Sequence, residues 1–99
     1  LLHWYCDKNR PVFEDFASYI GFVHICDHKQ TNPKKINDFE RVLPGEGNLP
    51  IEPFINCLKN SKYKGFSTIE VFRNDLYQPS DVRIKNSLLY IKRLWSKEL

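Results

Sequence analysis

The chain has 99 residues, 41% of them apolar and 14% aromatic, and a formal net charge of +3. This length allows one domain at most, and this composition is typical of a packed globular protein rather than of a disordered one. Because basic and acidic residues are interspersed, no basic stripe indicates a nucleic-acid partner. No segment approaches the roughly 18 apolar residues that a membrane-spanning helix requires. We therefore expect neither nucleic acid nor a membrane among the partners.

The cysteines and the N-terminal residues bear on the cellular location. Cys6, Cys26 and Cys57 are an odd number without the spacing of a disulfide framework, which favours reduced thiols. The N-terminus lacks the basic start and the long apolar stretch of a signal peptide. Both features predict a cytoplasmic location.

The first half of the chain predicts a helix, a strand and a long loop. Leu1–Tyr5 starts without methionine and is expected to be the end of a strand. A helical spacing of apolar residues follows, with Pro11 in its first turn and Gly21 at its end. Its members are Phe13, Phe16, Ala17 and Ile20. Phe22–Cys26 is then predicted to be a short strand, and Asp27–Gly47 is a polar connection of a length that tends to be functional.

A second helix is predicted after the long loop. We expect Asn48 to cap it, with Pro50 and Pro53 in its opening turn. Its apolar positions are Ile51, Phe54, Ile55 and Leu58. This spacing is the one that places side chains on a single helix face.

A second strand and a last helix complete the chain. Phe66–Phe72 is rich in β-branched and aromatic residues, as strands are, and Arg73–Pro79 is expected to be a loop. Ser80 is a suitable cap for the last helix. The apolar stripe of that helix, which we expect to pack in the core, is Ile84, Leu88, Ile91 and Trp95.

This order of elements predicts the fold class. Alternating helices and strands are typical of parallel strands joined by helical crossovers, so the class is α/β. Two strands cannot cover the apolar surface of these helices, so the remaining sheet has to come from elsewhere. We therefore interpret residues 1–99 as one unit of a larger domain, and the chain as a fragment or a processed piece.

Two polar residues lie in the apolar runs of the predicted strands, His24 in the first and Glu70 in the second. Burying an imidazole or a carboxylate costs free energy unless the group is paired or bound to a metal. Both residues fall toward the carboxyl ends of the strands, where binding groups gather in parallel sheets. A nitrogen and a carboxylate oxygen suit Mn, Co, Zn, Fe or, less well, Mg. The alternative is a hydrogen-bonded core histidine and a salt-bridged glutamate without a metal.

Three segments in register resemble one known family. They read His-Ile-Cys-Asp at 24–27, Arg-Val-Leu-Pro-Gly-Glu-Gly at 41–47 and Tyr-Lys-Gly-Phe-Ser-Thr-Ile-Glu-Val-Phe-Arg at 63–73. Their order and spacing resemble the C-terminal part of the sugar phosphate isomerase/epimerase superfamily, whose members are xylose isomerase-like TIM barrels. The last segment and the long loop are most similar to the inosose isomerase branch. The resemblance implies that residues 1–99 are the C-terminal part, about the last two β/α units, of a (β/α)8 TIM barrel.

The resemblance also implies roles for five residues. In that family four side chains hold a divalent metal, and His24 and Glu70 match the metal histidine and the last metal glutamate. Glu70 also matches one of two carboxylates that transfer a proton. His3 and Arg41 match residues that bind substrate oxygens, and Asp27 matches an acid that orients the histidine strand. The other two ligands, a glutamate and an aspartate immediately before the first residue, are not in this chain, so we expect the isolated chain to be inactive.

The activity that the resemblance implies for the whole protein is isomerisation or epimerisation next to a carbonyl, through an enediolate. The substrate would be a sugar, a sugar phosphate or an inosose, and the cofactor a divalent ion such as Mn, Co, Mg or Zn. The remaining barrel strands are then required partners, and a homo-oligomer is a further expectation.

Three other interpretations stay open. The first is a small zinc module with a tetrahedral site. The donors that it would use are His24, Cys26, His28 and either Cys6 or Cys57. The second is an endonuclease on the same type of barrel, which would need more metal ligands and a DNA-binding surface. The third is a truncated, non-catalytic remnant of the fold.

Overall fold

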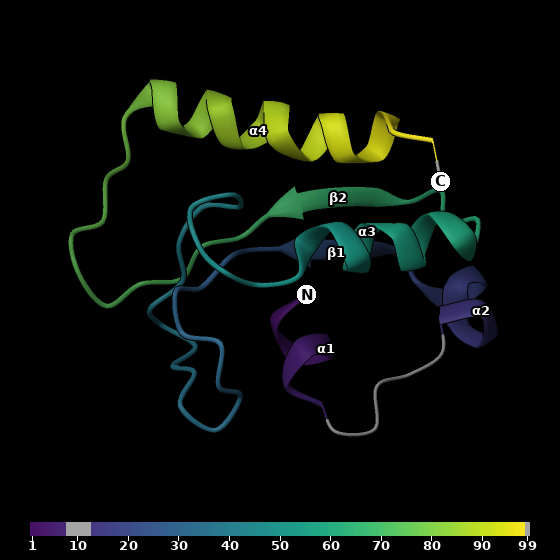
Figure 1. Ribbon diagram of the computed structural model, residues 1–99, viewed down its shortest axis with the longest axis horizontal. Coiled ribbons are helices and arrows are strands. Elements are labelled where there is room, and N and C mark those ends of the chain that lie inside the picture. The colour runs from purple at the N-terminus through teal and green to yellow at the C-terminus, as the bar shows by residue number, and fades with distance from the viewer. Residues whose placement is uncertain (8–12, 99) are drawn as a thin grey trace.

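The computed structural model describes residues 1–7 and 13–98. Its elements are α1 (Leu2–Cys6), α2 (Phe13–Phe16), a 3₁₀ turn (Ala17–Tyr19), β1 (Phe22–Ile25), α3 (Ile51–Asn60), β2 (Phe66–Ile69) and α4 (Asp81–Ser96). β1 and β2 are neighbouring parallel strands (Figure 1), as the alternation of helices and strands predicted. None of the described helices is long and apolar enough to cross a membrane.

The two strands form a sheet with one buried and one open face. They pair with Phe22 opposite Phe66, and the Glu70 N–H extends the ladder by donating to the carbonyl of Ile25 at 3.0 Å. Aromatic and β-branched residues in both segments favour the pleated strand. Because side chains alternate along a strand, Val23 and Ile25 are buried whereas Phe22 is exposed.

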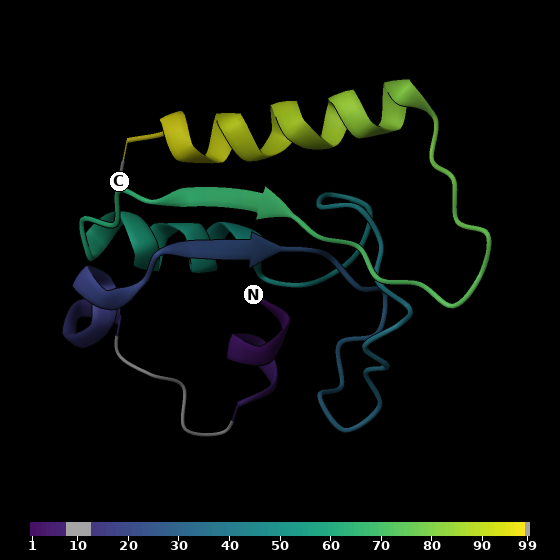
Figure 2. The same ribbon diagram turned by 180° about the vertical axis from the view of Figure 1, so that it is seen from behind.

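α3 supplies most of the core on the buried face. It lies in front of β1 in Figure 1 and behind it in Figure 2, so it covers one face of the sheet. Its buried side chains are those predicted from the spacing, Ile51, Phe54, Ile55 and Leu58. Ile91 and Leu94 of α4 and Leu2 of α1 belong to the same cluster. Pro53 fits in the first turn of α3 because the first N–H groups of a helix have no intrahelical partner.

The N-terminal predictions were partly wrong. Leu1–Tyr5 is not the end of a strand: Leu2–Cys6 is a short helix in which the Tyr5 N–H donates to the Leu1 carbonyl at 2.9 Å. The helix places Leu2 in the core, where it is 5% exposed. The next predicted helix is α2 followed by the 3₁₀ turn. Pro11, which we expected in its first turn, lies outside the described residues.

The long loop and the second strand differ from expectation at their ends. Residues 27–50 hold no helix or strand, as predicted. Asn48 does not cap α3, because Pro50 occupies the cap position and the Asn48 side chain instead donates to the Lys29 carbonyl at 3.0 Å. β2 ends at Ile69 rather than at Phe72, because the chain turns there to pair with the long loop.

α4 begins where the sequence predicted, and its buried face includes Ile91 of the predicted stripe but not the first half of that stripe. Ser80 Oγ accepts from the Arg83 N–H at 3.3 Å, which confirms the cap. The buried residues of α4 are Ser87, Ile91 and Leu94. Two members of the predicted stripe, Ile84 and Leu88, are exposed, and Trp95 is half-buried against the core.

Candidate active site

His24 and Glu70 lie side by side where the two strands end. His24 is in β1 and Glu70 directly follows β2, and the aligned register brings both to the carboxyl edge of the sheet. His24 Nδ1 lies 3.0 Å from Glu70 Oε2. The His24 side chain is 42% exposed and that of Glu70 27%, so both can be reached from the open face. The expected proximity of these two residues is therefore confirmed.

Arg41 contacts the same carboxylate oxygen. Its Nη1 donates to Glu70 Oε2 at 3.2 Å, its Nη2 to Asp38 Oδ1 at 2.6 Å and its Nε to the Asp38 carbonyl at 3.0 Å. Its guanidinium carbon lies 4.5 Å from the centroid of the Phe72 ring. Burial alone would lower the pKa of Arg41, but its contacts with Asp38 and Glu70 outweigh burial and raise that pKa above its ordinary value. A permanent positive charge therefore lies against Glu70.

The backbone of the long loop brings Arg41 to this position. Asp27 and Val42 exchange both backbone hydrogen bonds, at 2.9 Å and 3.0 Å. On the other side, the Arg41 N–H donates to the Phe72 carbonyl at 3.3 Å. The segment around Arg41 therefore lies between the end of β1 and the chain that follows β2, with its guanidinium against Glu70.

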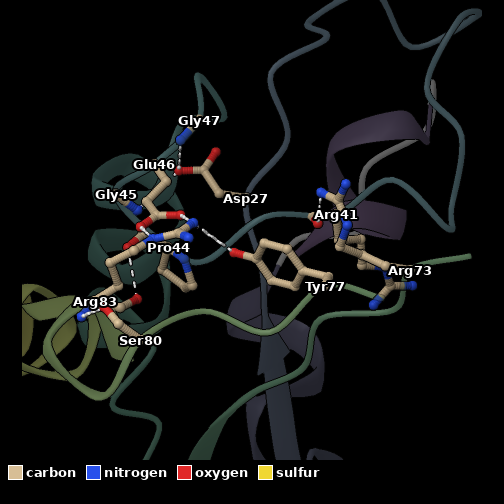
Figure 3. Close-up of polar contacts among 11 residues, drawn as sticks. Asp27, Arg41, Pro44, Gly45, Glu46, Gly47, Arg73, Tyr77, Ser80 and Arg83 are labelled. Atoms are coloured by element: carbon tan, nitrogen blue, oxygen red, sulfur yellow. Dashed lines mark hydrogen bonds and ion pairs between the residues drawn. The ribbon is translucent and has the colours of Figure 1, made fainter. Parts of the chain in front are cut away.

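The Asp27 carboxylate holds the Pro-Gly turn of the loop from within. It is 1% exposed and accepts four backbone N–H groups. Oδ1 accepts from His28 and Leu49 at 2.9 Å each, and Oδ2 accepts from Gly45 and Gly47 at 3.0 Å each. Gly47 permits this approach, because a Cβ there would lie 2.5 Å from Asp27 Oδ1. Figure 3 shows Asp27 pointing toward this turn, so its contacts reach well beyond the His24 strand that we expected it to orient.

α4 holds the same turn from outside. Three positions on one helix face lie against three turn residues: Arg83 bonds Glu46, Ser87 bonds Pro44, and the Tyr90 ring lies where a Cβ on Gly45 would be 3.3 Å from it. Arg83 donates to both Glu46 carboxylate oxygens, from Nε at 2.8 Å and from Nη2 at 2.5 Å (Figure 3). Ser87 Oγ donates to the Pro44 carbonyl at 2.7 Å. The turn that follows Arg41 is therefore fixed on two sides.

His3 is not brought into this group. It is an exposed residue of α1. Within the part of the chain that the structure describes, the hydrogen bonds and ion pairs of the His24, Glu70 and Arg41 side chains do not include the His3 ring. The start of α1 does lie beside β1, since the Leu1 amino group donates to the His24 carbonyl at 2.8 Å. A role of His3 in substrate binding stays a prediction.

Comparison with known families assigns the chain. Residues 2–94 match the family described as Xylose isomerase-like TIM barrel, a match that includes both strands, the long loop and most of α4. The chain belongs to this family. The predicted family and the predicted fold, part of a TIM barrel, are thereby confirmed.

Two known proteins, one of them with a solved structure, are similar to this xylose isomerase-like chain. It is 32% identical over 63 residues to an inosose isomerase from Halalkalibacterium halodurans, which covers 64% of this chain and 22% of that protein. The solved structure of a xylose isomerase domain protein from Alicyclobacillus acidocaldarius subsp. acidocaldarius matches with a TM-score of 0.78 and 26% identity, over 96% of this chain and 35% of that chain. The chain therefore spans well under half the length of either relative.

The donors of this xylose isomerase-like chain fit part of a metal site. An imidazole nitrogen and a carboxylate oxygen from neighbouring strands are ligands that Mn, Co and Zn accept. The described residues contain no group of three or more His, Cys, Asp or Glu side chains that could hold a metal ion. His24 and Glu70 therefore fit as two ligands of a site that needs others, and not as a complete site.

The zinc-module alternative finds no support in the described contacts. His28 is 3% exposed, and its Nδ1 accepts from the Gln30 N–H at 2.9 Å while its Nε2 lies 3.1 Å from the Asn37 carbonyl oxygen. Cys26 is a core residue, and burial raises the pKa of its thiol to about 11. Because zinc binds the thiolate, this environment disfavours Cys26 as a ligand.

Asp38 and Arg73 contribute to the site, and the sequence analysis assigned neither of them a role. The one signal for Asp38 is its position three residues before Arg41, a spacing that fits many surface pairs. Arg73 ends the Glu-Val-Phe-Arg segment, but its partner, the Arg41 carbonyl at 3.1 Å, lies 32 residues away. Contacts of this kind depend on the path of the loop, which no local pattern reveals.

Proposed function

We propose that this chain supplies part of the active site of a divalent-metal-dependent isomerase or epimerase that moves a proton next to the carbonyl of a sugar or an inosose. One observation carries the proposal: His24 and Glu70 meet at 3.0 Å at the carboxyl ends of adjacent parallel strands, the edge where TIM barrels place their active sites. The family of the chain supports the same reaction class. The chain spans a minor part of its relatives, so the activity belongs to the whole protein.

His24 and Glu70 would hold the metal ion together with ligands from other strands of the barrel. A divalent ion, Mn, Co, Mg or Zn, supplies polarisation of the substrate carbonyl and stabilises the negative charge that develops on its oxygen. His24 contributes a neutral nitrogen and Glu70 an anionic oxygen, and this mixed set suits such ions.

Glu70 would also act on the proton. Among the described contacts, both partners of its carboxylate lie at Oε2, so Oε1 is left to face a substrate. A carboxylate in this place takes the proton from the carbon next to the carbonyl, while the electron pair of that C–H bond forms the double bond of the enediolate. A second carboxylate returns a proton, so the reaction needs no oxidant or reductant. The Arg41 guanidinium keeps Glu70 in place through the hydrogen bond to Oε2.

His3 and Arg41 are proposed to contact substrate oxygens. Among the described contacts, three of the five N–H groups of Arg41 donate to Asp38 and Glu70, which leaves two for a substrate hydroxyl. His3 would reach the substrate from α1. The inosose isomerase relative favours an inosose as the first substrate to test, with sugars and sugar phosphates after it.

The proposal is tested by proton exchange in the full-length protein. With an inosose in D₂O and added Mn²⁺, deuterium is expected to enter the carbon next to the carbonyl, which NMR follows directly. Glu70→Gln is expected to slow this exchange by at least about 100-fold, because general-base catalysis contributes that much. Binding of Mn²⁺, measured by calorimetry, is expected to weaken in His24→Ala.

Glu52→Gln is the matched control, since Glu52 lies on α3 and pairs with Lys97 away from the site. It is expected to keep both exchange and metal binding within about twofold, as distant surface changes do. The proposal fails if the full-length protein exchanges no proton of an inosose, a sugar or a sugar phosphate. It also fails if Glu70→Gln retains the wild-type rate. Cleavage of abasic DNA in place of exchange would favour the endonuclease alternative.

A further inference from the structure

Arg73 joins the segment after β2 to the residue that contacts Glu70. Its Nη1 donates to the Arg41 carbonyl at 3.1 Å. Its Nε and Nη2 donate to the two carboxylate oxygens of Asp75, at 2.8 Å and 2.6 Å. Its guanidinium carbon lies 4.4 Å from the centroid of the Tyr77 ring. One side chain therefore uses all three nitrogens and its flat face on three different residues.

We propose that Arg73 is a positioning residue that holds Arg41 against Glu70, an inference that rests on the proposed function. Arg73 lies three residues after Glu70 and donates to Arg41 itself, so it joins the chain after β2 to the long loop at the site. An antiparallel bridge between Glu40 and Arg73 supports the same junction from the backbone. Without the Arg73 bond, the Arg41 carbonyl loses a charged donor, so the Arg41 backbone is held by fewer hydrogen bonds and its guanidinium is fixed less firmly against Glu70.

Tyr77 connects this junction to the Pro-Gly turn. The Tyr77 ring lies 5.5 Å from the Arg83 guanidinium carbon, and Tyr77 Oη lies 3.3 Å from Glu46 Oε1. Arg83 Nη2 also donates to Tyr77 Oη at 3.2 Å. Figure 3 shows Tyr77 between Arg73 and Arg83, with Arg41 beside Arg73. Tyr77, against which Arg73 packs, is therefore itself held by Arg83 of α4 and by Glu46 of the turn. These contacts limit where the Arg73 guanidinium can lie.

Arginine is specifically suited to this place. Its planar guanidinium presents two N–H groups to one carboxylate and a third in another direction. A lysine ammonium is a single point donor and cannot bond both Asp75 oxygens and the Arg41 carbonyl in this arrangement. An arginine that only balanced the charge of Asp75 would not need the bond to Arg41, so a charge-conserving substitution separates the two roles.

The test observes Arg41 directly. The full-length protein is labelled with ¹⁵N-arginine. The Arg41 Nε–H is expected to exchange slowly with solvent, because it donates to the Asp38 carbonyl and the Arg41 side chain is only 5% exposed. Arg73→Gln and Arg73→Lys are each expected to speed that exchange by at least about tenfold, since the residue is then held by fewer hydrogen bonds. Arg93→Gln, on an exposed position of α4, is the matched control and is expected to leave it unchanged.

Core amides separate loss of position from loss of fold. The amides of Ile25 and Ile55, which are fully buried, are expected to keep their protection in both variants. If Arg73→Gln exposes them too, Asp75→Asn decides: it leaves Arg73 in place without its ionised partner and is expected to speed Arg41 Nε–H exchange alone. Wild-type exchange of the Arg41 Nε–H in variants with a protected core overturns the inference.

The kinetics separate this inference from the proposed function. In an active protein, Arg73→Lys is expected to lower kcat/KM by about tenfold to 100-fold, because displacement of Arg41 disturbs both its contact with Glu70 and its contact with the substrate. A protein without isomerase activity whose Arg41 Nε–H still responds contradicts the proposed function and supports Arg73 as a positioning residue. An active protein whose Arg41 Nε–H exchange is unchanged in the Arg73 variants supports the proposed function and contradicts the positioning role of Arg73.

Discussion

At the scale of single residues, Asp27 shows how a buried carboxylate can fix a loop through backbone hydrogen bonds. A charge that leaves water needs compensation, and here four backbone N–H groups provide it. Those groups belong to the residue after Asp27 and to the turn 18–22 residues later. The carboxylate therefore converts a polar stretch without helix or strand into a defined loop, and the loop brings Arg41 to Glu70.

Asp27→Asn is expected to lower the free energy of unfolding by about 2–4 kcal/mol, because the amide NH₂ must face N–H groups that lose their acceptor. The measurement is urea unfolding, with amide exchange at Gly45, Gly47 and Leu49 to identify which oxygen was replaced. Asp15→Asn, at an exposed position of α2, is the control and should change stability by less than about 0.5 kcal/mol. Unfolding of Asp27→Asn at the wild-type urea concentration would contradict this account of the loop.

The sequence was informative about residues on strands and less so about residues on loops. Alternation in two short apolar runs sufficed to predict that His24 and Glu70 meet, because the register of parallel strands is regular. Asp38 could not be found in the same way, since its partner Arg41 approaches it through an irregular chain path. His3 could not be placed either, because Leu2–Cys6 has the composition of a strand end but forms a helix around a buried Leu2.

At the scale of elements, α4 serves the site through its polar face. The sequence predicted its start correctly from Ser80, but only the second half of the predicted apolar stripe, Ile91 and Trp95, packs in or against the core, whereas Ile84 and Leu88 are exposed. The face that packs inward carries Ser87, which is 3% exposed and whose hydroxyl is satisfied by donating to the Pro44 carbonyl. Hydrophobicity alone cannot identify a helix face whose partner is a backbone turn.

The contact between α4 and the turn predicts a pH dependence. The hydrogen bond from Arg83 lowers the pKa of the Glu46 carboxyl below its ordinary value, against the smaller opposing effect of burial. A pKa that is lower in the folded state means that ionised Glu46 favours folding. This stabilisation is complete above the ordinary glutamate pKa of about 4.3 and is lost as the pH falls through the lower, folded value.

Glu46→Gln is therefore expected to unfold at lower urea than the wild type at pH 7, with a difference that shrinks as the pH falls below 4. Urea titrations at several pH values between 7 and 3 measure this difference. Arg83→Gln should give the same trend, since it removes the other partner of the pair. A difference between wild type and Glu46→Gln that stays constant across this range would show that the ion pair does not contribute.

At the scale of the whole molecule, two apolar surfaces stay uncovered, one on the open face of the sheet and one between β2 and α4. Phe22 and Phe66 lie opposite each other at 61% and 82% exposure, on the face that carries His24. In a TIM barrel, side chains on that face fill the interior in layers contributed by several strands. An apolar hollow of about 350 Å³ between β2 and α4, lined by Ile84 and Leu88 among others, leaves a second apolar surface open. Helix and strand order revealed the fold class, whereas the residues that cover these surfaces are not among those described.

The isolated 99-residue chain is expected to bind the dye ANS and to self-associate as its concentration rises, because large exposed apolar patches drive association. Fluorescence and light scattering measure the two effects. Phe66→Ser is expected to reduce both, since it removes the most exposed aromatic ring of β2. Leu76→Ser is the matched control: Leu76 is 95% exposed but lies in the loop before α4 and on neither strand, so its loss should change neither signal. A chain that stays monomeric at high micromolar concentration and binds no ANS would mean that the open face is covered within the chain itself. His24 and Glu70 would then not face a barrel interior.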